Sequence, residues 1–150
     1  MYHHTTTLTT FGIKKLRSQF DYLKERYERI TQDLKDKTQS QSILASKRIE
    51  REIISSDMLK VETILSNATI LERSARPQQV EQGAKVTYVQ ENTGEKHVIT
   101  LVDPLEDDPL EGFISVQSPV GSALIGCQID DSVIIITPKV RLRITVLDIE

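Results

Sequence analysis

The stretch IKKLRSQFDYLKERYERITQDL, residues 13–34, spaces its apolar side chains alternately three and four residues apart. These side chains belong to Ile13, Leu16, Phe20, Leu23, Tyr27, Ile30 and Leu34. Such a repeat keeps one stripe of a helix facing a partner helix, which is the seam of a coiled coil. The spacing therefore predicts a helix over residues 11–36, about 39 Å long at 1.5 Å per residue. Thr9 or Thr10 is expected to cap its N-terminus through a side-chain oxygen.

A second stretch supplies a matching stripe. The same spacing recurs at Ile54, Met58, Val61, Leu65 and Ala68. Its phase extends back through Arg51, Lys47 and Leu44, so the seam becomes partly polar toward its far end. The polar connection near residues 37–42 is short and joins arms of similar length. This favours an antiparallel hairpin within one chain over a coiled coil between two chains.

The second half of the chain has a different composition. All five Pro and five of the six Gly lie at residue 77 or beyond, and the net charge changes from +3 over residues 11–74 to −6 over residues 75–150. A shift of this kind is typical of two structural units. We expect a flexible N-terminal tail, a helical hairpin, a linker and a β-rich domain over residues 1–8, 9–74, 75–79 and 80–150, respectively.

The β-rich domain is predicted from short runs rich in Val, Ile, Thr and Tyr. These runs indicate strands over residues 85–90, 97–102, 113–116, 133–137 and 141–148. Pro119 in the first turn and Gly126 after the last turn bound a short helix over residues 119–125. Acidic residues fill the loop over residues 103–111, which is expected to be a solvated connection or a surface for a basic partner. The predicted fold class is α+β, an antiparallel coiled-coil hairpin followed by a small β-rich domain.

Composition also bounds the function. No apolar run approaches the roughly 18–20 residues that span a bilayer, and the single cysteine, Cys127, allows no internal disulfide or Cys-rich zinc site. The sequence has no nucleophile–base set and no Gly-rich phosphate loop, so we expect no enzyme activity, no cofactor and no metal. The acidic second half disfavours direct nucleic-acid binding. We expect a soluble cytoplasmic protein without a membrane partner.

Several motifs carry a family resemblance. In the first half they are residues 9–16, 21–24 and 65–71. In the second half they are Leu101–Asp103, Gly112–Pro119, Ala123–Gly126, Asp130–Val133 and Thr137–Pro138. In this order they span nearly all of residues 9–149, and together they resemble the bacterial Gre transcription elongation factors, the GreA/GreB family.

The resemblance implies a coiled-coil hairpin joined to an FKBP-like C-terminal domain. It implies that the C-terminal domain binds RNA polymerase at the rim of its secondary channel, while the hairpin reaches down the channel. Gln117, Ser118, Pro119 and Ser122 are the polymerase-contacting residues that the resemblance implies. The residues themselves also predict Ser118 as the N-cap of the short helix. Family members usually have Ala-Arg where this chain has Gly121 and Ser122, so one charged contact is missing.

The predicted tip of the hairpin departs from the family pattern. Cleavage-competent members carry an acidic tip, Asp-Leu-x-Glu-Asn-Ala, that helps hold a Mg²⁺ ion. Here no Asp or Glu lies between Lys37 and Ile49, and roughly six fewer residues join the arms, or about 4–5 Å less reach per arm. The predicted tip residues are Lys37, Thr38, Gln39, Ser40, Gln41, Ser42, Lys47 and Arg48. Because Mg²⁺ needs oxygen ligands such as carboxylates, we predict that transcript cleavage is not stimulated.

Three functional hypotheses follow. The favoured one is a monomeric Gre-like factor that binds RNA polymerase and modulates transcription without stimulating cleavage. The second is a cleavage-competent elongation factor that uses the carboxylates flanking the tip, Asp33, Asp36, Glu50 and Glu52. The third is a coiled-coil and FKBP-like interaction module unrelated to transcription.

Overall fold

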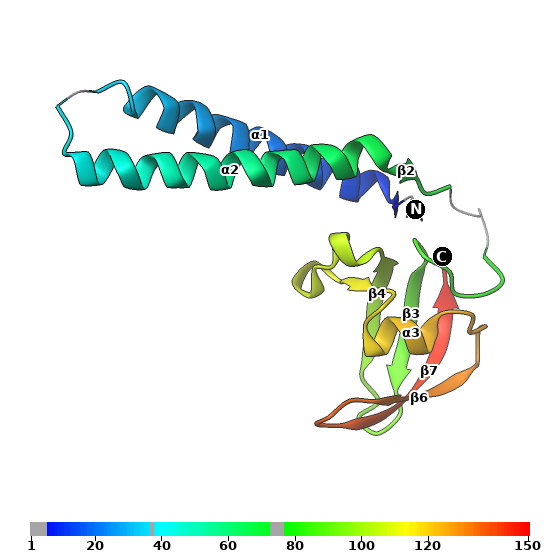
Figure 1. The fold of residues 1–150 in the computed structure, drawn as a ribbon. Helices are drawn as coiled ribbons and strands as arrows, with labels where there is room; N and C mark the ends of the chain where they lie inside the picture. Colours follow the sequence, from blue (N-terminus) through cyan, green and yellow to red (C-terminus); the bar gives the residue numbers. More distant parts are fainter. Residues whose placement is uncertain (1–5, 37, 73–76) are drawn as a thin grey trace, which may run out of the picture. The chain divides into compact units, whose positions relative to one another are not determined.

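The computed structural model describes residues 6–36, 38–72 and 77–150, and it consists of two long helices followed by a curled β-sheet (Figure 1). The chain forms two compact units, one holding Phe11–Thr69 and the other holding Thr7–Thr10 together with Ile70–Glu150. This architecture confirms the predicted α+β class. Among the described residues, none of the helices has the length and apolar character needed to cross a membrane.

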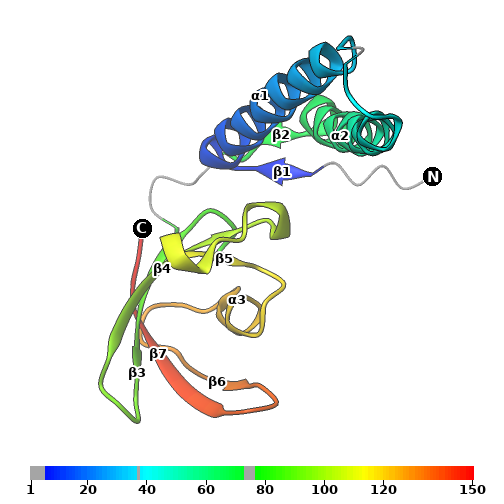
Figure 2. The same cartoon turned by 90° about the vertical axis from the view of Figure 1, so that its left-hand side faces the viewer.

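The first unit is an antiparallel helical hairpin. Helix α1 spans Thr10–Asp33 and helix α2 spans Gln41–Asn67, and the two run side by side in both views (Figures 1 and 2). The predicted seam is confirmed, because its central members are buried: Leu16, Leu23, Ile30, Ile54 and Val61. Two isoleucines on the neighbouring stripe of α2, Ile49 and Ile53, are exposed instead.

The turn of the hairpin begins earlier than predicted. Helix α1 ends at Asp33 rather than at Asp36, because the N–H of Asp36 donates to the carbonyl of Asp33 at 3.1 Å. This is an i to i+3 bond, which tightens the end of a helix and stops its propagation. Helix α2 then starts after Ser40, whose side chain accepts a hydrogen bond from the N–H of Ile43 at 3.4 Å. Lys37, a predicted tip residue, lies outside the described residues.

The second unit contains a five-stranded sheet in the order β5-β4-β3-β7-β6. The strands are β3 (Lys85–Gln90), β4 (Lys96–Val102), β5 (Phe113–Ser115), β6 (Ser132–Ile136) and β7 (Arg141–Ile149). Only the β4–β5 pair of this sheet is parallel. Helix α3 (Pro119–Leu124) lies within the curl of the sheet (Figure 2). All five predicted strands and the short helix are present, with ends shifted by a residue or so.

The core of this unit lies between α3 and the inner face of the sheet. Its buried members are Val80, Ala84, Val86, Ile99, Leu101, Leu124, Cys127, Ile135, Ile144, Val146 and Ile149. Strand β7 shows the predicted alternation, since Ile144 and Val146 are buried while Arg141 and Arg143 are exposed. The outer face of β7 is therefore open to solvent, as in an antiparallel sheet with one wet side.

The predicted tail of residues 1–8 needs a correction at its end. Thr7 and Leu8 form strand β1, which pairs with β2 (Thr69–Ile70), and the side chain of Leu8 is fully buried. The N–H of Leu71 donates to the carbonyl of Leu8 at 2.8 Å. A two-residue strand has no periodicity of its own, so only its distant partner could have revealed it. Of the predicted linker over residues 75–79, the first two residues, 75 and 76, lie outside the described residues.

Candidate functional site

The residues singled out by the sequence on the β domain lie around the first turn of α3. Ser118 precedes the helix in an extended conformation, and its Oγ accepts a hydrogen bond from the N–H of Gly121 at 3.0 Å. Pro119 follows as the first helical residue, where a missing N–H leaves no unpaired donor. The predicted capping role of Ser118 is therefore confirmed, and its side chain is committed to the fold.

The other predicted contact residues present their side chains to solvent. Gln117, Pro119 and Ser122 are exposed, whereas Ser118 is half-buried. Their backbone is held in place, because the N–H of Gln117 donates to the Oγ of Ser115 at 3.0 Å and the hydroxyl of Ser122 donates to the carbonyl of Ser118. The first turn of α3 is thus a fixed platform with exposed side chains.

Gly121 allows α3 to lie directly against strand β5. A Cβ atom at this position would sit 2.1 Å from the carbonyl oxygen of Ser115 and 2.9 Å from the Cα of Val116. Both are backbone atoms, which cannot rotate away as a flexible side chain would. Glycine at this position is therefore required by the close approach of α3 to strand β5.

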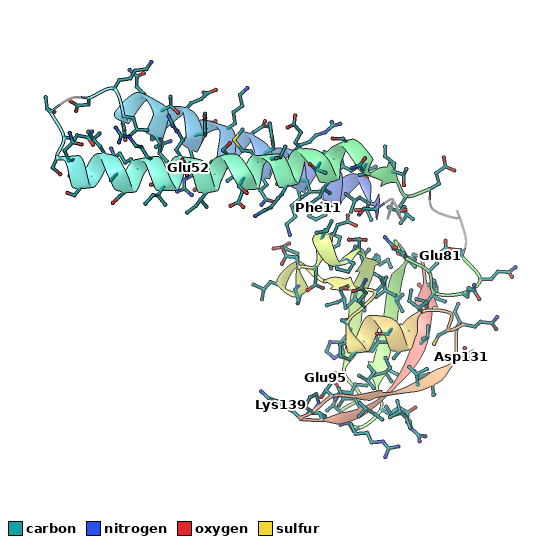
Figure 3. The ribbon with its side chains drawn as sticks, viewed as in Figure 1. Phe11, Glu52, Glu81, Glu95, Asp131 and Lys139 are labelled. Carbon is teal, nitrogen blue, oxygen red and sulfur yellow. The ribbon has the colours of Figure 1, made fainter. Side chains whose placement is uncertain are left out.

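An apolar groove of about 570 Å³, called here the α3 groove, adjoins these residues. Val80, Val116 and Ile125 supply apolar lining, and Ser122 lies at the groove as well. Its other lining residues are Gln79, Glu81, Gln82 and Gly126; Figure 3 labels Glu81 on this loop. An apolar groove edged by amide, hydroxyl and carboxylate groups can accommodate an apolar group with polar neighbours.

The sequence predicted only Ser122 among the residues of the α3 groove. The loop containing Val80 joins the groove because its N–H donates to the carbonyl of Cys127 at 2.7 Å, and its carbonyl accepts from the N–H of Gly126 at 2.8 Å. These bonds connect segments more than 40 residues apart. No local motif marks Val80 or Ile125 as site residues, and only the fold places them together.

The acidic segment Asp103–Glu111 is more ordered than the solvated loop that the sequence predicts. It folds into two short 3₁₀ helices, η1 (Pro104–Glu106) and η2 (Pro109–Glu111). Glu106, expected in a solvated loop, is fully buried and accepts hydrogen bonds from the N–H and hydroxyl of Thr9. The carboxylate of Asp107 accepts from the N–H of Ser115 at 2.6 Å. These two carboxylates satisfy backbone donors, so the segment is not simply a free acidic surface.

At the hairpin tip, the described residues form a polar turn. Thr38, Ser40, Gln41, Ser42 and Arg48 are exposed, while Gln39 and Lys47 are half-buried. The Oδ1 of Asp36 accepts hydrogen bonds from the hydroxyl of Thr38 at 2.6 Å and from its N–H at 2.9 Å. These two bonds lower the pKa of Asp36 below its ordinary value of 3.8, and the bond from the hydroxyl has the larger effect. The carboxylate of Asp36 is therefore occupied in shaping the turn.

Two of the four carboxylates that flank the tip, Asp33 and Glu50, are engaged in ion pairs across the hairpin. The Nζ of Lys47 lies 2.8 Å from the Oδ2 of Asp33, and the guanidinium of Arg26 pairs with the carboxylate of Glu50. Among the described residues, no three His, Cys, Asp or Glu side chains converge in a way that could hold a metal ion. The donor set of the tip therefore does not fit the Mg²⁺ that the family resemblance implies for cleavage-competent members.

Cys127 is a structural residue. Its Sγ donates to the carbonyl of Ala123 at 3.3 Å, and the side chain is buried in the domain core. Burial raises the pKa of the thiol, and the negative charge of Asp131 adds a smaller effect in the same direction. The thiol therefore stays protonated at neutral pH and is a poor nucleophile.

A helical hairpin followed by a small β domain with an apolar surface groove defines a two-unit α+β protein. Comparison with known proteins identifies it further. The family described as "Transcription elongation factor, GreA/GreB, C-term" matches residues 75–150. The transcription elongation factor GreA of Halalkalibacterium halodurans is 32% identical over 150 residues, covering 95% of this chain and 94% of that protein. The chain belongs to the GreA/GreB family of transcription elongation factors.

Two further similar proteins are a curated relative and a solved structure. GreA of Bacillus subtilis is 29% identical over 149 residues, covering 95% of this chain and 94% of that protein. Among solved structures, the GreA factor homolog 1 (Gfh1) of Thermus thermophilus is 28% identical, with 98% of this chain and 99% of that chain covered and a TM-score of 0.44.

Proposed function

We propose that this chain binds bacterial RNA polymerase at the secondary channel through the α3 surface of its β domain, and modulates transcription without stimulating transcript cleavage. Family membership supports action on transcription. The fixed first turn of α3, with Gln117, Pro119 and Ser122 exposed beside the α3 groove, supports this surface as the contact.

The absence of stimulated cleavage is proposed because most carboxylates near the hairpin tip already have partners. Stimulated cleavage requires free carboxylate oxygens that a hard cation can bind at the end of the arm. Asp33 and Glu50 are paired with Lys47 and Arg26, and Asp36 is hydrogen bonded to Thr38. Glu52 is exposed on α2, and a single carboxylate is a poor metal site. Releasing two ion pairs to bind one metal ion would cost interactions that the hairpin already makes. A factor with this tip occupies the channel but does not supply the carboxylate ligands that would hold a Mg²⁺ ion there.

The test uses a stalled, backtracked elongation complex that carries end-labelled RNA. The protein alone is expected to leave the RNA at full length, and an excess of it is expected to suppress the cleavage stimulated by an authentic Gre factor. RNA shortened by this protein alone would contradict the absence of cleavage. Failure to co-sediment with polymerase, together with no effect on the authentic factor, would reject the transcription role.

Two exposed isoleucines allow a matched control for the α3 groove. Ile125 lines the groove and is 42% exposed, whereas Ile129 is 48% exposed and is not among the residues lining it. We expect Ile125→Glu to weaken polymerase binding about tenfold or more, because a charge in an apolar contact is left without a partner. Ile129→Glu should bind as the unaltered protein does. Equal binding by both variants would place the contact elsewhere.

A further inference from the structure

Strand β6 forms an open edge of the five-stranded sheet, because it is last in the strand order and pairs with β7. At its end, the N–H of Thr137 donates to the carbonyl of Val140 at 2.9 Å. Hydrogen-bonded and non-bonded residues alternate in an antiparallel pair, so every second residue counted back from Thr137 also bonds β7. The backbone N–H and C=O groups of the residues between them point away from the sheet; these residues are Ser132, Ile134 and Ile136. No described residue forms a hydrogen bond with these outward groups.

The opposite edge of the sheet, strand β5, is covered by the chain itself. Phe113 and Asp108 exchange backbone hydrogen bonds at 2.8 and 3.0 Å, and the N–H of Ser115 donates to the carboxylate of Asp107 at 2.6 Å. An uncovered edge strand can pair with another chain, and proteins usually protect such an edge with a charge, a proline or a covering segment. Strand β6, with the sequence Ser-Val-Ile-Ile-Ile, contains no charge and no proline.

The backbone and the apolar side chains of β6 are complementary to a second copy of the same strand. When two β6 strands run antiparallel about Ile134, this residue faces Ile134 of the second copy, and Ser132 faces Ile136. Each of these facing pairs can exchange two backbone hydrogen bonds. The side chains of Ile134 and Ile136 are 39% and 71% exposed, so they are available to pack across the two strands.

The charges at the ends of β6 favour the same antiparallel arrangement. Asp130 and Asp131 precede the strand and Lys139 follows it, and Figure 3 labels Asp131 and Lys139 toward its opposite ends. Lys139 forms no ion pair with any described residue. Antiparallel pairing brings the acidic end of each copy to the basic end of the other, whereas parallel pairing would bring like charges together.

We propose that this chain forms a homodimer in which β6 pairs antiparallel with β6 of a second copy, so that the two sheets continue as one. This interaction goes beyond the proposed function and departs from the expectation of a monomer. The contact is isologous, because both copies contribute the same strand, so association closes at the dimer. Two short strands form a small interface, and the dimer is therefore weak and short-lived.

Sedimentation velocity of the full chain, at increasing concentrations up to about 1 mM, measures the association. The unaltered protein is expected to sediment faster as its concentration rises. Ile134→Lys places two like charges opposite each other at the centre of the contact, so it should lower the association constant about tenfold or more. Val98→Lys is the matched control, because Val98 is a 53% exposed β-branched residue on β4, an inner strand of the same sheet. This control should associate as the unaltered protein does.

A charge swap at one position tests the self-pairing of Ile134. Ile134→Glu, like Ile134→Lys, brings like charges together in its own dimer and should associate weakly. An equimolar mixture of the two variants places Glu opposite Lys, so it is expected to form dimers that neither variant forms alone. Unchanged circular dichroism of each variant shows that it is folded.

Amide hydrogen exchange, followed by NMR at low and high protein concentration, tests whether the backbone makes the contact. The N–H groups of Ile134 and Ile136 should exchange more slowly at high concentration, whereas those of Val133 and Ile135, which already bond β7, should change little. The proposal is overturned if the unaltered protein stays monomeric throughout, or if the charge-swapped mixture does not associate. It is also overturned if Val98→Lys weakens association as much as Ile134→Lys, or if exchange at Ile134 and Ile136 does not slow.

Discussion

At the scale of single residues, Gly121 determines how closely α3 approaches strand β5. A Cβ atom there would lie 2.1 Å from the carbonyl oxygen of Ser115, so Gly121→Ala must displace the helix or the strand. We expect the substitution to destabilise the β domain by about 3 kcal/mol, the upper part of the usual range for overpacking. Urea unfolding followed by the amide NMR signals of the β domain measures the change.

Ser122→Ala is the matched control for this prediction. Ser122 is adjacent in α3 and exposed, and among the described residues its hydroxyl donates to the carbonyl of Ser118 alone. Its replacement is expected to change stability by less than about 0.5 kcal/mol, as for surface sites in general. A Gly121→Ala protein as stable as this control would mean that α3 can shift outward without loss.

Two residue roles lay beyond prediction from the sequence, for a common physical reason. Glu106 is buried against Thr9, which is 97 positions away in the chain. Within an acidic segment the sequence marks it as one more solvated carboxylate. Gly121 reads only as a helix residue, because the carbonyl that it approaches belongs to another element. Ser118 was predictable because a cap and its helix are contiguous, so the bond that defines its role is local.

At the scale of elements, the turn of the hairpin depends on the ionised form of Asp36. Its pKa is lowered by the hydrogen bonds from Thr38, so the carboxylate stabilises the turn fully above the ordinary value of 3.8. This contribution is lost as the pH falls below that value and through the lowered pKa. We expect the amide NMR signal of Thr38 to shift with a midpoint below pH 3.8.

Thr38→Val provides the comparison for this titration, because it removes the side-chain hydrogen bond and leaves the N–H in place. The carboxyl signal of Asp36 should then titrate closer to pH 3.8 than in the unaltered protein. Identical midpoints in the two proteins would show that the turn does not stabilise the carboxylate.

Elements with a repeating pattern were predictable, and elements without one were not. The two helices follow from apolar spacing, and β7 follows from the alternation of Arg141, Leu142, Arg143 and Ile144. Strand β1 has two residues, too few for any period, and forms only through its distant pairing with β2. The α3 groove likewise depends on backbone bonds between the segments of Val80 and Cys127. Local periodicity predicts which elements form, whereas the groove depends on tertiary hydrogen bonds.

At the scale of the whole molecule, the two units have separate hydrophobic cores, and each is expected to unfold in its own transition. Gly121→Ala should lower the melting temperature of the β-domain transition by at least roughly 10 °C and leave the hairpin transition in place.

A substitution at Arg51, which is half-buried in the hairpin seam, should instead stabilise the hairpin. Arg51→Leu extends the apolar seam and should raise only the hairpin transition, by about 1 kcal/mol of stability.

Calorimetry of both variants and of the double variant measures this independence. Because the two sites lie in different units and share no partner, their effects should add within about 0.5 kcal/mol. Arg48→Leu, at an exposed position on the same helix, controls for added apolar surface outside the seam. A single transition that moves as a whole in every variant would show that the arm and the β domain unfold together. The arm would then owe its stability to the β domain rather than to its own seam.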